Sequence, residues 1–454
     1  MEDVFRVVEK NQDVYIKWLQ ELCRIPSVAA QNRGMDKAAG KVKEWIEEFC
    51  QGQSKLVATD GFPVVYGEVQ GEVDKTLLFY NHYDVQPEDP IDLWTHPPFS
   101  AEIHDGVLYA RGVADNKGNL IARMAAVHAL QEARGKLPIN VKFVFEGEEE
   151  IGSVNLPAFC RNHQDLLAAD ACIWEFGYKN ADGRQQVSLG VKGMVYIELI
   201  CRGASTDLHS ANAAIIENPA WRLVQALHSM RDDSGYVKIE GFYDEVEAPI
   251  ESDRVLLDQL IYSEEETKEK LGIDRFVNGV SGHELKEQLI FSPTCNICGL
   301  TSGYQGEGTK TVLPNVASVK LDFRLVPNQD PHTILGKIRD HLDKNGYSDI
   351  ELKEFGLEHP ARTNPQDAIA QSVVMMTEKV LGQKPTVMPM SPGTGPMYEV
   401  CQQFDIPAVS VGVGHFSSNN HAPNENIVVQ DFIDGIKLMA AVIDDFSQRG
   451  GDEL

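Results

Sequence analysis

Residues 140–153 read NVKFVFEGEEEIGS, an apolar stretch that runs directly into three consecutive glutamates, Glu148, Glu149 and Glu150. The valines and phenylalanines at its start predict a buried β-strand. Neighbouring carboxylates at the end of such a strand repel one another unless cations or solvent neutralise them. The stretch therefore indicates either a cation site at a strand end or, in its plainest interpretation, an exposed acidic loop.

Strands and helices alternate on both sides of this stretch. Towards the N-terminus we expect strands near 64–69 and 76–82, amphipathic helices over 10–24 and 35–50, and a long helix over 116–134. After Pro360 we expect a helix over 368–382, a strand within 406–414 and a closing helix over 430–447. This alternation predicts an α/β domain with a mixed or mostly parallel sheet flanked by helices.

A different pattern occupies the middle of the chain. Strands over 195–203, 294–300 and 316–326, with helices over 218–232 and 331–344, predict a smaller α+β unit. The metal-binding and catalytic candidates described below fall before residue 190 or after residue 360. We therefore expect a discontinuous catalytic domain, residues 1–187 and 359–454, interrupted by an inserted domain at residues 188–358.

The composition excludes several classes of protein. The chain has 454 residues, of which 43% are hydrophobic, and its 41 Lys and Arg face 68 Asp and Glu, a formal net charge of −27. That hydrophobic content excludes a disordered chain. Binding to nucleic acid or to an anionic membrane needs clustered basic residues, so we expect neither partner.

Targeting and cysteine patterns predict a cytoplasmic protein. The N-terminus lacks a basic segment followed by an apolar core, and no apolar run reaches the eighteen or so residues that span a bilayer. We expect the final GDEL to match a retrieval signal only by coincidence. The eight cysteines lie in apolar stretches, which predicts buried reduced thiols. Cys295 and Cys298 should face opposite sides of a strand, which argues against a shared metal or redox site.

Histidines and acids recur where predicted strands end. His82 and Asp84 stand two apart and so share one face, where the carboxylate can fix the imidazole tautomer. Asp115 precedes the long helix, Glu175 is a lone acid in the apolar ACIWEFG, and His421 follows the strand within 406–414. Singly, each has an ordinary interpretation as a capped loop histidine, a helix N-cap or a surface loop. Together they indicate one site.

The charges of these groups suit two divalent cations. Two such ions bring four positive charges, and Asp115, Glu150 and Glu175 as ligands bring three negative ones. His82 and His421 add neutral nitrogen donors, which completes the oxygen and nitrogen mixture that zinc accepts. Manganese and cobalt accept the same donors. A pair of ions can activate a water and polarise a carbonyl, and an acid outside the ligand set must then move protons.

The order of these motifs resembles a known family. The segments His-x-Asp at 82–84, Gly-x-x-Asp-x-Lys-Gly at 112–118, Glu-Gly-x-Glu-Glu-x-Gly-Ser at 146–153, the lone acid and the C-terminal histidine are similar to those of the co-catalytic dinuclear zinc peptidases. That family includes cytosolic nonspecific dipeptidase, carnosinase, glutamate carboxypeptidase, aminoacylase and succinyl-diaminopimelate desuccinylase. The segments DLHS at 207–210, KTVLP at 310–314 and FRLVP at 323–327 look most like the dipeptidase branch.

The resemblance implies a catalytic domain of the zinc-peptidase fold with a defined set of ligands. His82, Asp115 and Glu175 would bind one zinc ion. Asp115, Glu150 and His421 would bind the other, with Asp115 bridging the two. A cis peptide bond would follow Asp115.

The resemblance also assigns roles around the metals. Asp84 would orient His82 from outside the metal shell, and Glu149 would be the general base. The insertion would be a lid and dimerisation domain, whose His209 would reach the partner subunit's site in a homodimer and steady the developing oxyanion. Arg324 and Thr394 would bind the substrate carboxylate. Without the resemblance, the histidine of DLHS could cap a helix and Arg324 could pair with an acid.

Hydrolysis of dipeptides or short peptides is the expected activity. Two departures from the family pattern favour an alternative, a carboxypeptidase or N-acyl-amino-acid amidohydrolase on the same scaffold. The sequence Ala211-Asn212-Ala213-Ala214 stands where the family usually has glycines, and Glu175 stands where members that act on a free amine tend to carry Asp. A non-catalytic homologue would lack the base, which is present here.

Overall fold

An eight-stranded sheet is assembled from both ends of the chain in the computed structural model, which describes residues 1–449. Its strands are β1 Gln53–Val57, β2 Val64–Val69, β3 Gly71–His82, β6 Leu137–Glu146, β7 Ala171–Trp174, β9 Gln186–Ser188, β18 Thr386–Met388 and β19 Ala408–Ser410. They follow the order β1-β2-β6-β3-β7-β19-β9-β18. β3 pairs in parallel with β6 and β7, whereas β2 pairs antiparallel with β1 and β6. The predicted mixed sheet is confirmed.

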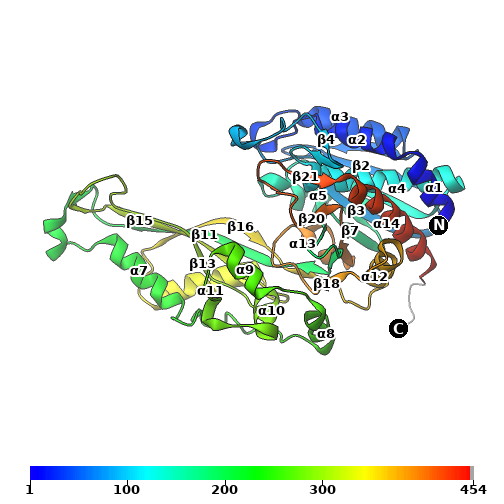
Figure 1. The fold of residues 1–454 in the computed structure, drawn as a ribbon. Helices are drawn as coiled ribbons and strands as arrows, with labels where there is room; N and C mark the ends of the chain where they lie inside the picture. The colour runs from blue at the N-terminus through cyan, green and yellow to red at the C-terminus, as the bar shows by residue number, and fades with distance from the viewer. Residues whose placement is uncertain (450–454) are drawn as a thin grey trace.

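Helices cover both faces of this sheet because its central strands are apolar on both sides. Leu77 and Phe79 of β3 belong to a core cluster shared with one helix layer, and Leu78 and Tyr80 point into a second core on the other face. The first layer contains α1 Glu2–Lys10, α2 Gln12–Cys23, α3 Met35–Glu48, α4 Gly118–Arg134, α12 Ala368–Leu381 and α14 Val429–Gln448. The second layer contains α5 Leu156–Asn162, α6 Gln164–Leu167 and α13 Met397–Val400. Figure 1 shows the resulting layers.

The N-terminal helix prediction was incomplete. A single helix over 10–24 was expected, but the chain forms two helices, α1 and α2, separated by Asn11, whose φ of −102° and ψ of 9° lie outside the helical region. α1 buries only Val4 and Val8, which pack into the core beside α4. With nine residues, α1 is shorter than the roughly ten to twelve over which an apolar pattern identifies a helix.

A second, four-stranded antiparallel sheet is formed by the middle of the chain. Its strands are β11 Gly193–Arg202, β13 Asn296–Ser302, β15 Val316–Leu325 and β16 Glu351–Glu358, in the order β13-β15-β11-β16. The helices α7 Pro219–Met230 and α11 Pro331–Lys344 pack with it around a separate apolar core. This unit extends away from the larger sheet in Figure 1. The proposed domain limits at 187/188 and 358/359 stay a prediction.

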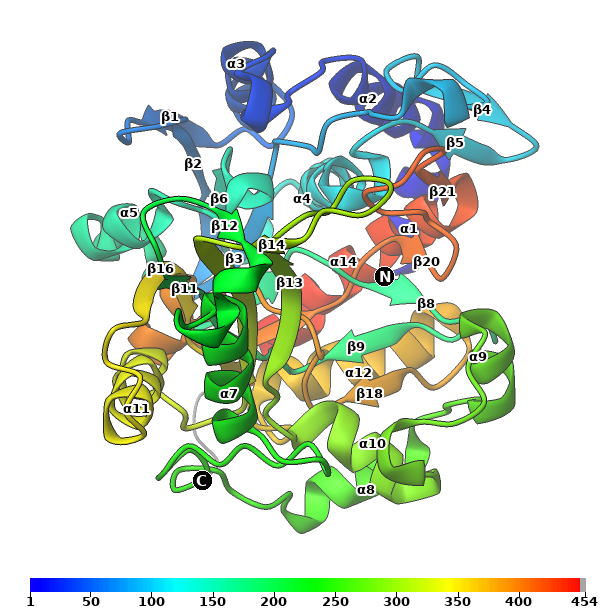
Figure 2. The same cartoon turned by 90° about the vertical axis from the view of Figure 1, so that its left-hand side faces the viewer.

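Three helices that the sequence analysis did not predict connect the two units. They are α8 Glu251–Gln259, α9 Glu264–Leu271 and α10 Gly282–Phe291. Leu257 of α8 and Ile290 of α10 pack against Met388 and Met390, which lie in and just after β18 of the large sheet. Figure 2 shows α8 and α10 beside β18 and α12. The inserted segment therefore contributes surface to the catalytic unit.

The cysteine prediction needs one correction. All eight cysteines are free, and six are buried, but Cys295 is half-buried and Cys298 is exposed. Cys295 packs against the core of the second unit, while the Cys298 thiol donates to Asp322 Oδ1 at 3.2 Å, so the two side chains do point to different surroundings. Within residues 1–449, no helix is both long and apolar enough to cross a membrane. The GDEL sequence lies outside the described residues.

Candidate metal centre

His82 ends the buried strand β3 and is itself fully buried. Its Nδ1 lies 3.0 Å from the backbone carbonyl oxygen of Asp84 and 3.4 Å from Asp84 Oδ1. A carbonyl oxygen only accepts, so Nδ1 carries a proton, and Nε2 is the nitrogen that faces the centre of the site and could bind a metal ion. Asp84 Oδ2 accepts from the backbone N–H of Glu150 at 3.0 Å, so Asp84 contacts the imidazole through its backbone carbonyl and the glutamate loop through its carboxylate.

Asp115 lies between two histidines. Its Oδ1 is 3.1 Å from His82 Nε2, and its Oδ2 is 3.3 Å from His421 Nε2. His421 Nε2 is also 3.1 Å from Glu150 Oε2, and Asn420 donates to Asp115 Oδ2 at 3.2 Å. The two oxygens of one carboxylate thus face two different imidazoles. This is the arrangement required of a carboxylate that bridges two cations.

The buried carboxylate of Glu425 shapes the loop that presents Asp115. It accepts from Arg111 Nη1 at 2.7 Å and from the backbone N–H groups of Gly112 at 2.9 Å and Asp115 at 3.0 Å. Gly112 has a φ of +83°, and a Cβ there would lie 2.2 Å from Val85 Cγ1, so this position requires glycine. The sequence analysis gave Glu425 no role, although it lies only four residues after His421.

The peptide bond between Asp115 and Asn116 is cis, as the resemblance implied. Asn116 Nδ2 donates to the backbone carbonyl of Glu175 at 3.1 Å. Arg123, buried on α4, donates to the same carbonyl at 3.0 Å and to that of Trp174 at 2.6 Å. These donors fix the end of β7, which places the Glu175 side chain at the site.

The carboxylates of Glu149 and Glu175 are crowded in the buried centre. Glu175 Oε2 lies 3.7 Å from His82 Nε2 and is buried with no hydrogen-bond partner, and Glu149 Oε2 lies 4.0 Å from the same nitrogen. Burial raises the pKa of Glu175 to about 7. Burial, followed by the charge of Glu175, raises the pKa of Glu149 well above its usual value. A buried carboxylate oxygen without a partner is relieved by a cation.

The donors fit divalent metal ions. Two groups each offer ligand atoms that lie within 4.8 Å of one another: His82 with Glu149 and Glu150, and Asp115 with Glu150 and His421. Hydrogen bonds to Asp115 and Glu150 raise the pKa of His421 to about 10, so the carboxylates hold a proton where positive charge is needed. The second group is the predicted ligand set of one ion. In the first, Glu149 lies within the group and Glu175 lies beside it.

A cavity of about 570 Å³ opens from these residues. Asp115, Glu149, Glu175 and His421 line one end. The walls come from the end of β7 and the residues after it (Trp174, Phe176 and Tyr178), from Leu260, Ile261, Tyr262 and Leu289 of the insertion, and from the loop 391–395. A cavity of this size with apolar walls and a charged end suits a small amphipathic substrate.

Two of the three predicted substrate-binding residues are in contact, and the third lies elsewhere. Thr394 lines the cavity, and Arg324 on β15 donates from Nη1 to Thr394 Oγ1 at 2.5 Å while its Nε pairs with Asp322 at 3.0 Å. His209 lies on the short strand β12 Leu208–His209, where it is exposed and accepts from the backbone N–H of Ala211 at 3.1 Å. It is not among the described residues that line the cavity.

Known proteins identify the family. The sequence profile of peptidase family M20/M25/M40 matches residues 78–445, which include all of the predicted ligands. The chain belongs to this M20 family. The chain is thus a metal-dependent peptidase, an enzyme, and the predicted family and fold are confirmed.

Relatives of this M20 chain match over nearly its whole length. An M20 family metallo-carboxypeptidase from Sulfolobus solfataricus is 41% identical, with a TM-score of 0.91 over 95% of this chain and 99% of that one. The human Beta-Ala-His dipeptidase is 28% identical over 99% of this chain and 93% of its own length. The Cys-Gly metallodipeptidase of Schizosaccharomyces pombe is 26% identical over 98% of both chains.

Proposed function

We propose that this M20 peptidase hydrolyses the peptide bond of dipeptides or short peptides, with Glu149 as general base. The observation that carries the proposal is the placement of Asp115 between His82 and His421, beside three further carboxylates. His82, Asp115 and Glu175 would hold one divalent ion, and Asp115, Glu150 and His421 would hold the other.

The metals most suited to these donors are zinc ions, with manganese and cobalt as substitutes. When bound, the pair lowers the pKa of a shared water and polarises the scissile carbonyl. The protein positions the metal donors before a metal binds. The backbone carbonyl of Asp84 accepts from His82 Nδ1, and the Glu425 carboxylate accepts from the backbone N–H of Asp115.

Glu149 moves the proton. It follows a strand end at which Glu150 reaches His421, so the neighbouring carboxylate is left to face the cavity. Because it is assigned to neither ion and lines the cavity, Glu149 is free to take a proton from the attacking water and return it to the leaving amine.

The free carboxylate of the substrate binds at the end of the cavity that Thr394 lines, and Arg324, which is not among the described lining residues, contacts Thr394 there. Arg324 and Thr394 are hydrogen-bonded to each other, and the guanidinium can offer a planar pair of donors to a carboxylate. Asp322 holds the Nε side of Arg324 and so keeps its Nη groups directed at Thr394. This end of the cavity selects substrates that end in a free carboxylate.

A carboxypeptidase or N-acyl-amino-acid amidohydrolase is a second candidate. Among the described residues that line the cavity, the only acidic ones are Asp115, Glu149 and Glu175, and all three are already assigned to the metals or to the proton transfer. A substrate amine would therefore meet no spare carboxylate there. The 41% identity to a metallo-carboxypeptidase supports the same candidate.

Three substrates that share one C-terminal residue separate the candidates. With metal-replete protein, we expect Ala-Leu to be cleaved much faster than Ala-Ala-Leu or N-acetyl-Leu, because a dipeptidase positions the free amine close to the metals. Release of leucine, measured by chromatography, gives the three values of kcat/KM. Equal or faster cleavage of the acetylated compound or the tripeptide would replace the dipeptidase proposal with the second candidate.

We also propose a cytoplasmic homodimer in which His209 completes the partner's site. The free and mostly buried cysteines suit a reducing compartment. His209 is exposed on the second unit and away from the cavity of its own chain, so a role in catalysis requires a second subunit. There it would donate to the oxyanion that develops in the transition state.

Mixing two inactive variants tests this exchange. His209→Ala is expected to lower kcat by about 10²–10³-fold without loss of metal, because it removes one oxyanion donor. Unfolded and refolded together with equal amounts of Glu149→Ala, it should regain up to about a quarter of wild-type activity, since half of randomly formed dimers carry one complete site. Activity of the mixture that stays at the sum of the separate variants would rule out action in trans.

A further inference from the structure

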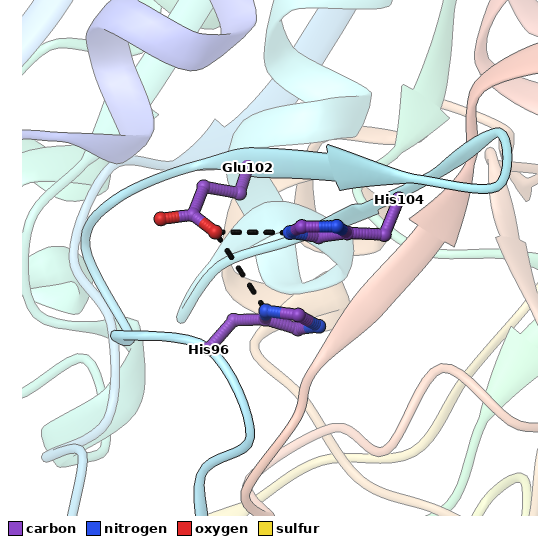
Figure 3. A group of neighbouring side chains, drawn as sticks. All are labelled: His96, Glu102 and His104. Carbon is purple, nitrogen blue, oxygen red and sulfur yellow. Dashed lines mark hydrogen bonds and ion pairs between the residues drawn. The ribbon is translucent and has the colours of Figure 1, made fainter.

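A second group of potential ligands lies outside the catalytic centre. His96, Glu102 and His104 offer ligand atoms that all lie within 4.8 Å of one another. His96 belongs to the loop that precedes β4 Glu102–His104, the edge strand of a small sheet ordered β21-β5-β4. None of the three residues belongs to the ligand sets of the proposed catalytic ions. Figure 3 shows their arrangement.

The strand and the loop direct three donors to one point. Glu102 and His104 stand two apart on β4 and so project from the same face. Glu102 Oε2 lies 2.9 Å from His104 Nε2 and 3.6 Å from His96 Nδ1 (Figure 3). One carboxylate oxygen therefore faces a nitrogen from each of two imidazoles.

Packing fixes one of the imidazoles and leaves the other free to turn. The rings of His96 and His104 stack at 3.9 Å, and Tyr109, which lies opposite Glu102 on β5 Val107–Tyr109, packs on His96 at 4.9 Å. The His96 side chain is 21% exposed, whereas those of Glu102 and His104 are 45% and 46% exposed. A shared cation needs the two ring planes to converge, so the exposed His104 ring would have to rotate out of its stack on His96 when the ion binds.

We propose that His96, Glu102 and His104 form a third metal site, which binds a divalent transition-metal ion such as zinc. Two imidazole nitrogens and one carboxylate oxygen are donors that zinc takes in three-ligand sites, and water fills the remaining position. The chain's net charge of −27 favours cations near its surface.

The ion would stabilise the loop between β20 Gly414–His415 and β21, which carries His421. Just before His96, the backbone N–H of Thr95 donates to Asn424 Oδ1 at 2.7 Å, and Asn424 Nδ2 donates to the Leu93 carbonyl at 3.1 Å. The small sheet holds the same loop from its other end, because β21 Asn426–Val428 pairs with β5. An ion bound by His96 and by Glu102 and His104 of β4 would link the contacts of Asn424 with residues 93–95 to the pairing of β21 with β5.

Metal counting on the full-length protein tests the site. Wild-type protein, stripped with a chelator and brought to equilibrium with a fixed concentration of free Zn²⁺, is expected to bind three ions per chain. His104→Ala and Glu102→Gln, both at exposed side chains, should each bind two. His228→Ala, a change at an exposed histidine on α7, is the matched control and should bind three.

Amide hydrogen exchange shows where in the chain the third ion binds. Zinc beyond two equivalents should slow amide exchange within residues 91–105 of the wild type but not of His104→Ala. Two bound ions in the wild type, or a third ion that survives both substitutions, would overturn the proposal. The third site is independent of the proposed function: if only the catalytic pair failed to bind, the wild type would hold one ion and His104→Ala none.

Discussion

Glu149→Gln is expected to lower kcat by about 10³–10⁴-fold while both catalytic ions stay bound. Glutamine keeps the size of the side chain but can neither take a proton from the attacking water nor return it to the leaving amine. The imidazoles and the carboxylates of Asp115 and Glu150 are untouched, so the ligands of the site remain. Steady-state kinetics on a good dipeptide and metal analysis of the same sample give both numbers.

The adjacent Glu148→Gln is the matched control. The carboxylate of Glu148 is bound within the fold: its Oε1 accepts from the backbone N–H of Phe62 at 3.1 Å and its Oε2 from that of Asn155 at 3.1 Å. This variant should keep kcat within a few-fold of the wild type. Comparable activity of the Glu149 and Glu148 variants would remove Glu149 from the role of base.

These three consecutive glutamates mark a limit of prediction from sequence. A buried strand that ends in a charged loop was predictable from the apolar run that precedes it. The different contacts of the three glutamates were not predictable, because they depend on the short turn Glu149–Ile151 and on Gly152, whose φ is +90°. With this turn, Glu148 accepts from the backbone of Phe62 and Asn155, Glu150 contacts His421, and Glu149 faces the cavity.

Contacts between residues far apart in the sequence could not be predicted either. Glu425 matters because it meets Arg111, which is 314 residues away in the sequence, and no local pattern announces such a pair. Helices α8 and α10 are stabilised by contacts with Met388 and Met390, so their own sequences carry only part of the signal. The grouping of the candidate ligands was easier to anticipate, since strand ends collect at one edge of a sheet and the order of motifs resembled a known family; their binding of metal stays a prediction.

Asp115→Asn is expected to abolish activity more completely than Glu149→Gln, by more than about 10⁴-fold, through loss of both catalytic ions. One oxygen of Asp115 faces His82 and the other faces His421, so the substitution removes the negative charge that both ions would share and replaces one of the two oxygen donors with an amide nitrogen. The amide also presents N–H donors to one of these imidazole nitrogens. Metal analysis in the His104→Ala background, which excludes the proposed third site, should then give close to zero ions per chain.

The variant Asp84→Asn distinguishes the loss of a metal ligand from the loss of a residue that only orients a ligand. Asp84 is predicted to orient His82 without binding metal, so its substitution should weaken metal affinity by about 10–100-fold and leave a site that excess zinc refills. Activity of Asp84→Asn should therefore return as zinc is raised, while that of Asp115→Asn should not. If Asp115→Asn instead keeps two ions, Asp115 is not the bridge, and the close contacts of its two oxygens with His82 and His421 would need another explanation.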